Sequence, residues 1–251
     1  MGGERTVIVT GGTKGIGAAI ARTFYASGAH VVMGARSDND LAKELGERAQ
    51  FWPMDVCKPS EQRALVQAAL DWTGRIDVFI NNAGVSAWRP LAKVNEDFWH
   101  RVIDTNLKGT FFGCQAAAAH LGQGGCIINV SSLAGKRGSL NNSVYCASKF
   151  GVNGITQALA KELGPRGIRV NAVCPVYVRT EGLFKALAEQ DAPPGGKDVE
   201  TYLWDFAASN SPLGNLPTAD EVARVCLFLA SPAAATITGQ CINVDCGVLP
   251  Q

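Results

Sequence analysis

The chain alternates short apolar runs with longer stretches in which apolar residues recur every three or four positions. Seven runs have the length of strands, and six carry no charge in the middle: "TVIVT", "HVVMG", "FWPMD", "DVFIN", "CIINV", "RVNAV" and "CINVD". Such runs are typical of strands that are buried on both faces. The longer stretches predict helices over Ile16–Ser27, Ser60–Trp72, Asn95–His120, Val144–Leu163 and Thr218–Leu229, with Ser60 and Thr218 as N-caps.

The regular alternation of strand and helix predicts right-handed crossovers and an α/β, doubly wound fold: a seven-stranded parallel sheet with helices on both faces. A chain of 251 residues with 47% hydrophobic content suits a single domain over 1–251. One segment breaks the rhythm, because "DAPPGGKD" separates two helical pieces within Arg179–Pro217. An insertion of this length, at about 179–217, predicts a lid or a substrate-binding loop.

Charge and composition exclude several classes of function. The net charge of +1, from 23 basic and 22 acidic residues, provides no field that would attract nucleic acid or an anionic membrane. The N-terminal apolar run is too short for a signal peptide, and no run approaches the length of a membrane span, so we expect a cytoplasmic protein. Eight cysteines without a CxxC pair and three histidines without ligand spacing predict reduced thiols and no metal site.

The turn after the first predicted strand is rich in glycine. It reads "TGGTKGIG", Thr10 to Gly17, and leads directly into a helix. Glycines allow the backbone to approach a pyrophosphate, and the free N–H groups of the helix start attract its charge, although an ordinary tight turn also needs glycine. The second strand ends in Ala35 and Arg36 rather than in an acid. Arg36 with Lys14 suits a ribose 2′-phosphate; the alternative is that both are solvated surface cations.

Three motifs at characteristic spacings identify a family resemblance. They are "TGGTKGIG", "NNAG" at Asn81–Gly84, and Ser132 followed by Tyr145-x-x-x-Lys149. From Thr6 to Gly247 the chain resembles the short-chain dehydrogenases/reductases. The resemblance implies a Rossmann fold and a hydride transfer between a nicotinamide cofactor and a secondary alcohol or ketone, with NADP favoured and NAD as the alternative. The cofactor-binding residues that it implies are Gly11, Thr13, Lys14, Gly15, Ile16, Gly17, Arg36, Asp55, Val56, Asn82, Ala83, Gly84, Tyr145, Lys149, Pro175, Val178 and Thr180.

Tyr145 and Lys149 lie four positions apart, on one face of a predicted helix. A tyrosine hydroxyl with its ordinary pKa of about 10 is a poor base at neutral pH, and a nearby ammonium group would lower that pKa. The pair alone also fits an ordinary surface helix, but Ser132 ends a predicted strand at the sheet edge where ligands bind. The resemblance implies that Tyr145 is the general acid/base and that Lys149 also binds the nicotinamide ribose. It implies that Ser132 holds the substrate oxygen and that Asn106 supports a water that links Lys149 to solvent.

Two positions depart from the family pattern: Val176 stands where glycine is common, and "VDCG" replaces the usual "VDGG". We expect the first to shift a loop slightly and the second to affect packing or subunit contact. The resemblance also implies a homotetramer, built partly on the helix with Phe111, Phe112, Cys114 and Ala116–Ala119. Two rivals remain open at this point, a non-catalytic nucleotide sensor and a scaffold that uses this helix face.

The loops expected around the substrate are 86–89, 133–142 and 177–212, and they mix aromatic with polar side chains. These side chains are Trp88, Tyr177, Phe184, Trp204 and Phe206 with Ser86, Arg89, Arg137, Asn141, Asn142, Arg179 and Lys185. The mixture favours a small polar alcohol such as a sugar, polyol or hydroxy acid, with an anionic group for a basic residue to pair. Trp204 or Phe206 would exclude water from the hydride path. The alternative is a 3-oxoacyl or apolar ketone reductase.

Overall fold

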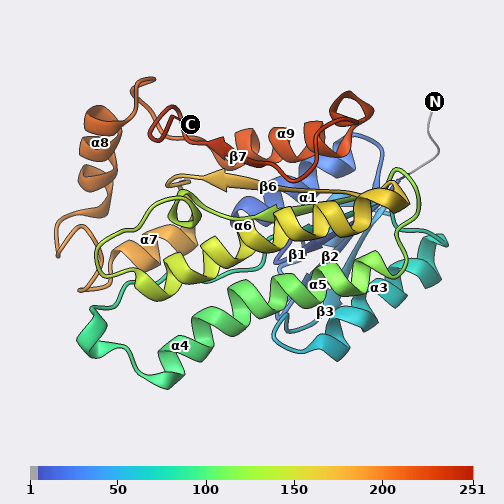
Figure 1. The fold of residues 1–251 in the computed structure, drawn as a ribbon, viewed down its shortest axis with the longest axis horizontal. Coiled ribbons are helices and arrows are strands. Elements are labelled where there is room, and N and C mark those ends of the chain that lie inside the picture. Colours follow the sequence, from blue (N-terminus) through green and yellow to red (C-terminus); the bar gives the residue numbers. More distant parts are fainter. Residues whose placement is uncertain (1–4, 251) are drawn as a thin grey trace.

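The seven apolar runs form the seven strands of one parallel sheet. A computed structural model describes residues 5–250, and Figure 1 shows the sheet between two layers of helices. The strands are β1 Thr6–Thr10, β2 His30–Ala35, β3 Ala49–Pro53, β4 Val78–Asn81, β5 Cys126–Val130, β6 Arg169–Pro175 and β7 Cys241–Val244. Their order is β3-β2-β1-β4-β5-β6-β7, and every neighbouring pair is parallel. The predicted doubly wound fold is confirmed.

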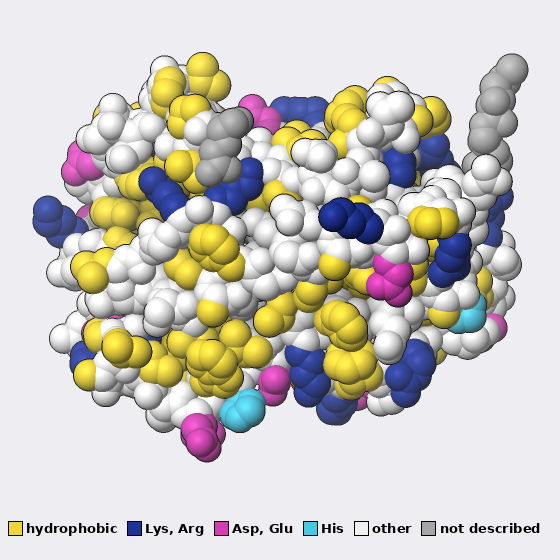
Figure 2. All heavy atoms as spheres, viewed as in Figure 1, with side chains coloured by type: hydrophobic (Ala, Val, Ile, Leu, Met, Phe, Trp, Pro, Cys, Tyr) yellow, Lys and Arg dark blue, Asp and Glu magenta, His cyan; other side chains and the backbone are white. Residues whose placement is uncertain are grey.

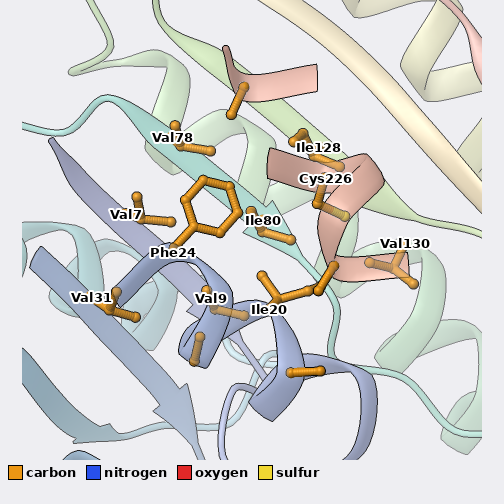
Figure 3. Close-up of a cluster of buried hydrophobic side chains, with 14 of the residues drawn as sticks. Val7, Val9, Ile20, Phe24, Val31, Val78, Ile80, Ile128, Val130 and Cys226 are labelled. Atoms are coloured by element: carbon orange, nitrogen blue, oxygen red, sulfur yellow. The ribbon is translucent and has the colours of Figure 1, made fainter. Parts of the chain in front are cut away.

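Helices cover both faces because alternate strand residues point to opposite sides. The helices are α1 Gly15–Ala26, α2 Leu41–Leu45, α3 Pro59–Thr73, α4 Glu96–Ile103, α5 Gly109–Ala118, α6 Ser143–Leu163, α7 Glu181–Leu187, α8 Val199–Asn210 and α9 Ala219–Ala230. Val7 and Val9 pack beneath α1 and α9 with Phe24 and Cys226 (Figure 3), whereas Ile8 packs beneath α3, α5 and α6. All five of these side chains are at most 1% exposed, so this sandwich is the main core.

Three local predictions need correction. The single helix predicted over Asn95–His120 is divided, because α4 and α5 are joined by a π-helical turn at Asp104–Lys108. Ser60 does not cap α3, which begins at Pro59 after Lys58, whereas Thr218 caps α9 in a capping box with Glu221. On α5, Cys114, Ala116 and Ala117 are buried in the protein's own core, so they are not part of a surface for a partner.

The sheet order places the candidate site. The chain moves outward from β1 to β2 and β3, then returns to place β4 on the other side of β1. The turns that follow β1 and β4 therefore diverge at one point of the carboxyl edge, which is where ligands bind in open α/β sheets. The insertion predicted at about 179–217 contains α7 and α8, drawn in orange at one end of the molecule in Figure 1.

Some features that would suggest other functions are not found within residues 5–250. No helix in this range is long and apolar enough to cross a membrane. The cysteines are free thiols, and no group of three or more His, Cys, Asp or Glu side chains in the same range is placed to hold a metal ion.

Candidate active site

The glycine-rich turn packs so closely that three of its glycines, Gly11, Gly12 and Gly17, admit no side chain. Gly11 has a φ of +62°, and a Cβ there would lie 2.9 Å from the Cα of Ala83. A Cβ on Gly17 would lie 2.2 Å from the carbonyl oxygen of Gly11. Gly15 differs, because it is exposed, its φ is +55°, and its Cβ would meet only Thr180, with the Cγ2 at 3.4 Å. The turn thus has one open side, as the pyrophosphate of a dinucleotide requires.

The turn after β4 is hydrogen-bonded to the glycine turn. The Thr10 hydroxyl accepts from the backbone N–H groups of Asn82 (3.0 Å) and Ala83 (3.2 Å). The Asn82 side chain donates in return to the carbonyls of Thr10 (3.0 Å) and Gly11 (3.1 Å). Asn82 was predicted to contact the cofactor, and the structure shows that its side-chain donor already fixes the turn. The Asn82 side chain therefore holds the glycine turn in shape, and its contact with a cofactor stays a prediction.

The other predicted cofactor residues lie along the same edge. Lys14 precedes α1 and Arg36 follows β2; both side chains are exposed, and neither forms an ion pair with an acid among residues 5–250. The backbone N–H of Cys57 donates to Asp55 at 3.0 Å and holds the pKa of that carboxyl below its usual range. Val56 is buried against the position of Gly109.

On the far side of the cradle, the segment after β6 closes the site. Pro175 ends β6, Val178 is buried in the core, and the Thr180 hydroxyl caps α7 by accepting from the N–H of Leu183 at 3.2 Å. This cap fixes Thr180 beside Gly15. Val176 donates its N–H to the carbonyl of Val244 at 3.4 Å, so the residue that replaces the usual glycine is tied to β7.

Tyr145, Lys149 and Ser132 converge where α6 passes the end of β5. Lys149 is only 5% exposed; its Nζ donates to the carbonyl of Val130 at 2.8 Å and lies 5.8 Å from the centroid of the Tyr145 ring. The Ser132 hydroxyl lies near enough to the Tyr145 phenol to lower its pKa. Ser131 is buried and instead donates to the carbonyl of Lys149 at 3.3 Å. The structure therefore favours Ser132 over Ser131 as the serine beside the tyrosine, as the spacing predicted.

Burial controls the pKa values of Tyr145 and Lys149. Burial raises the pKa of Tyr145 to about 12, and the nearby Ser132 hydroxyl opposes this only in part. Burial also lowers the pKa of Lys149 to about 8. Desolvation disfavours the phenolate and the ammonium alike, and it is the main cause of both shifts. That Lys149, together with a bound cationic nicotinamide, lowers the pKa of Tyr145 stays a prediction. At neutral pH Tyr145 is a phenol, which is the form that donates a proton to a carbonyl oxygen.

Asn106 occupies the π-helical turn between α4 and α5 and is fully buried. Its Oδ1 accepts from the N–H of Val85 at 2.8 Å, and its Nδ2 donates to the carbonyl of Val85 (3.0 Å) and to Ser148 (3.2 Å). Gly84 separates it from Lys149: a Cβ there would lie 3.2 Å from the Asn106 Oδ1 and 3.8 Å from the Lys149 Nζ. The side chain thus clamps the loop after β4, and the predicted water link stays a prediction.

The insertion packs onto the sheet edge through its own small core. Trp88 is buried there with Leu187 and Leu203, rather than open to a substrate. Tyr177 stacks edge-on with Phe206 at 4.9 Å between ring centroids, and its hydroxyl lies 3.2 Å from that of Tyr202. Of the two aromatics predicted to exclude water, Phe206 therefore lies inward. Trp204 is 64% exposed and lies beneath the Arg179 guanidinium, so it does not fit that role.

Asp191 joins the insertion to the other substrate loops, and nothing in the sequence singled it out. Its carboxylate lies 2.8 Å from Lys93 and 3.6 Å from Arg89, and its carbonyl accepts from the Asn141 side chain at 3.2 Å. The backbone N–H of Arg89 donates to the carbonyl of Asn141 at 2.6 Å. We call these contacts the Asp191 clasp. The signal that could have found it is the pair of cations after "NNAG" with one acid in a proline- and glycine-rich loop.

Three of the cations predicted to pair with an anionic substrate already have acidic partners. Arg89 pairs with Asp191, Arg179 with Glu200 at 2.5 Å and Lys185 with Glu181 at 2.5 Å. These pairs weaken the argument for an anionic substrate and leave the argument for a polar one intact.

Comparisons with known proteins agree with this geometry. A family profile described as enoyl-(acyl carrier protein) reductase matches residues 11–249. The chain is 42% identical to a putative ketoacyl reductase of the monensin polyketide synthase from Streptomyces virginiae, over 98% of this chain and 97% of that protein. It is 36% identical to the D-threitol dehydrogenase of Mycolicibacterium smegmatis, over 97% of this chain and 92% of that protein. A solved variant of the actinorhodin polyketide ketoreductase with NADPH is 34% identical, has a TM-score of 0.90, and matches over 98% of this chain and 97% of that one. The chain therefore belongs to the short-chain dehydrogenase/reductase family, and is an NAD(P)-dependent oxidoreductase.

Proposed function

We propose that the protein transfers a hydride between NADP(H) and a small secondary alcohol or ketone that carries further polar groups. The observation that carries the proposal is the convergence of Ser132, Tyr145 and Lys149 beside the open glycine turn. When bound, the nicotinamide supplies or accepts the hydride. Ser132 holds the carbonyl oxygen, Tyr145 donates its phenolic proton to that oxygen during reduction, and Lys149 holds the ribose.

Preference for NADP is supported by what lies at the end of β2. No acid stands at Ala35, and Arg36 and Lys14 are exposed beside the turn. Asp38 is the next acid along the chain, and its Oδ1 already accepts from the N–H groups of Asn39 (2.7 Å) and Asp40 (3.0 Å) rather than being available to a ribose hydroxyl. An arginine at this place suits a 2′-phosphate through a planar, two-point contact.

The class of substrate is supported by the loops around Tyr145 and by the relatives. Asn142, Tyr177 and Tyr202 provide neutral polar groups near the start of α6 and in the insertion. One relative acts on a polyol and another is named a ketoacyl reductase, and both kinds of substrate carry a second oxygen near the reacting carbon. Reduction of a 3-oxoacyl compound is therefore the second candidate function, and the first relative's name favours it.

The test is to follow the absorbance of reduced nicotinamide with NADPH and NADH against a panel of ketones, polyols and 3-oxoacyl thioesters. The proposal expects turnover of small polar ketones and a higher efficiency with NADPH. Turnover confined to long apolar ketones would contradict the substrate class, and a clear preference for NADH would contradict the cofactor.

We also propose that the protein is a homotetramer. Trp99, Phe111 and Phe150, from α4, α5 and α6, are 42–48% exposed, and apolar side chains gather over α4 and α5 on the face seen in Figure 2. Strand β7 is one of the two edge strands of the sheet, and an open edge favours pairing with another copy. Light scattering on the eluting protein should give four times the mass of the 26.5 kDa chain, and a monomer mass would contradict the proposal.

A further inference from the structure

The side chain of Asn142 has no partner in the protein. Asn142 is 5% exposed, its Oδ1 is buried without a hydrogen-bond partner, and its Nδ2 donates to no residue of the 5–250 range. Leaving a buried amide unpaired destabilises the folded protein. A buried polar group without a hydrogen-bond partner is rare in a native protein and needs an explanation. A ligand that bonds to the group is one such explanation.

Two other buried amides have an unpaired oxygen, and they differ from Asn142. The Gln62 nitrogen donates to the carbonyls of Val56 (3.3 Å) and Gly109 (3.1 Å). The Asn243 nitrogen donates to the carbonyl of Leu249 at 2.6 Å. Both amides are therefore bound within the fold through one end, whereas the Asn142 amide is bound at neither end.

The side chain of Asn142 also does not cap α6, although Asn142 is the N-cap residue of this helix. Asparagine is among the best N-cap residues because its side chain accepts from the first helical N–H groups. Asn95 does this for α4, accepting from the N–H of Phe98 at 2.9 Å. Asn142 makes no such bond, with φ −129° and ψ 21°. The amide therefore makes no bond to the helix end and can bind another partner.

The position of Asn142 on α6 indicates what that partner is. The N–H of Cys146 donates to the carbonyl of Asn142 at 2.8 Å, so the helical ladder begins at this residue. Asn142, Tyr145 and Lys149 are spaced i, i+3 and i+7, which places them along one face of the helix. Tyr145 lies between the other two. If Lys149 holds the ribose, Asn142 lies on the side of Tyr145 that is away from the cofactor, where the rest of the substrate must extend.

We infer that the Asn142 amide determines specificity by hydrogen-bonding a second oxygen of the substrate. This inference rests on the proposed function. Three helical residues rise about 4.5 Å, a spacing that suits an oxygen on the carbon next to the reacting carbon or on the one beyond it. An amide both donates and accepts, so it binds either a hydroxyl or a carbonyl oxygen there. The substrate class is thus a ketone oxygenated at the adjacent or next carbon.

The test compares wild type with Asn142→Leu on hydroxyacetone, 4-hydroxybutan-2-one and butan-2-one, with NADPH. Leucine is apolar and of similar size. We expect kcat/KM for the better hydroxyketone to fall about tenfold in N142L while that for butan-2-one changes by less than about threefold. Comparing each ketone between variant and wild type removes differences in intrinsic reactivity. Asn210→Ala, an exposed asparagine at the end of α8, is the matched control and should change neither value.

Stability provides the second readout. Because leucine removes an unpaired amide, N142L should unfold at the same temperature as wild type or a higher one. An equal loss of efficiency on all three ketones, or unchanged efficiency on the hydroxyketones, would overturn the inference and leave the proposed function standing. A lower unfolding temperature would assign Asn142 a structural role and overturn it as well. If wild type oxidises neither NADPH nor NADH with any of these ketones, the proposed function falls and the inference with it.

Discussion

Gly15 provides a direct test of the cofactor cradle, because a methyl group there should disturb binding more than folding. Its φ is +55°, in the left-handed region, and the added Cβ would meet nothing closer than Thr180 at 3.4 Å. The folding cost of Gly15→Ala is therefore the backbone strain alone, about 1–2 kcal/mol. For a domain of this size, that predicts a fall in unfolding temperature of about 2–8 °C.

Gly74→Ala is the matched control. Gly74 caps α3 with a φ of +75°, and an added Cβ would have no neighbour within 4 Å. Gly74→Ala should destabilise the fold by the same backbone strain as Gly15→Ala, but Gly74 lies far along the chain from the glycine-rich turn. We expect G15A to weaken NADPH binding at least tenfold, about 1.4 kcal/mol or more, because the methyl occupies the open side where phosphate oxygens would approach the backbone N–H groups.

The assay is a titration of each variant with NADPH, followed by the quenching of protein fluorescence, beside thermal unfolding of the free proteins. Equal destabilisation with weakened binding in G15A alone would support the cradle. The reasoning would be refuted if G15A bound NADPH as tightly as G74A, since the open side of the turn would then have no part in binding.

Three further changes test separate contacts. Arg36→Ala should reduce the preference for NADP over NAD by about 1.5–3 kcal/mol in kcat/KM, through loss of a charged hydrogen bond, and an unchanged preference would mean that Arg36 stays in solvent. Asp191→Asn should raise KM a few-fold with little change in kcat. The ion pairs of Asp191 with Arg89 and Lys93 are partly exposed, so together they should stabilise the loops by only about 1 kcal/mol. A KM equal to that of wild type at both low and high salt would argue against the clasp. Lys149→Met should remove a pH dependence of stability. The pKa of Lys149 is about 8 in the folded protein and about 10.4 in the unfolded protein, so the unfolded state binds more protons between these pH values. The free energy of unfolding of wild type should therefore rise with pH across this window, by up to about 3 kcal/mol. Urea unfolding across this window should show that slope in wild type and not in K149M, and the same slope in both would assign it to other groups.

The fold was predictable because its signals are local. Charge-poor runs such as "TVIVT" and "CIINV" are buried on both faces, and the order of strand and helix leaves few arrangements of a parallel sheet. The run "FWPMD" was placed two residues late, since β3 is Ala49–Pro53 and pairs with β2 from Ala49 onward. Edge strands carry weaker periodicity than central ones, and Trp52 and Pro53 are exposed.

The sequence was enough to predict that the candidate residues lie close together, but not how burial shifts their pKa values. Spacing was enough to bring Ser132 and Tyr145 together, but the sign of the Tyr145 pKa shift depends on how deeply the hydroxyl is buried. The same limit applies to Asn106 and Asn82, whose side chains bind backbone groups of distant segments. Asp191 was missed because its partners are about a hundred residues away in sequence.

In the "VDCG" segment, the cysteine that replaces the usual glycine has a strained backbone conformation. Cys246 stands where the family usually has glycine, and its φ is +54°, in the left-handed region that favours glycine. Its effect was predicted to be on packing or subunit contact, and the left-handed φ implies a backbone strain of about 1–2 kcal/mol. The Ser211 hydroxyl donates to its carbonyl at 3.1 Å and helps to hold this conformation.

The central claim is that Tyr145 provides the proton for hydride transfer to a ketone. The most direct test is Tyr145→Phe, which removes one hydroxyl and leaves the ring contacts with its neighbours. We predict that Y145F binds NADPH with nearly wild-type affinity while its oxidation of NADPH by a ketone that wild type reduces falls at least about a hundredfold, as expected for loss of a general acid. Retention of most of the wild-type rate in Y145F would contradict the account.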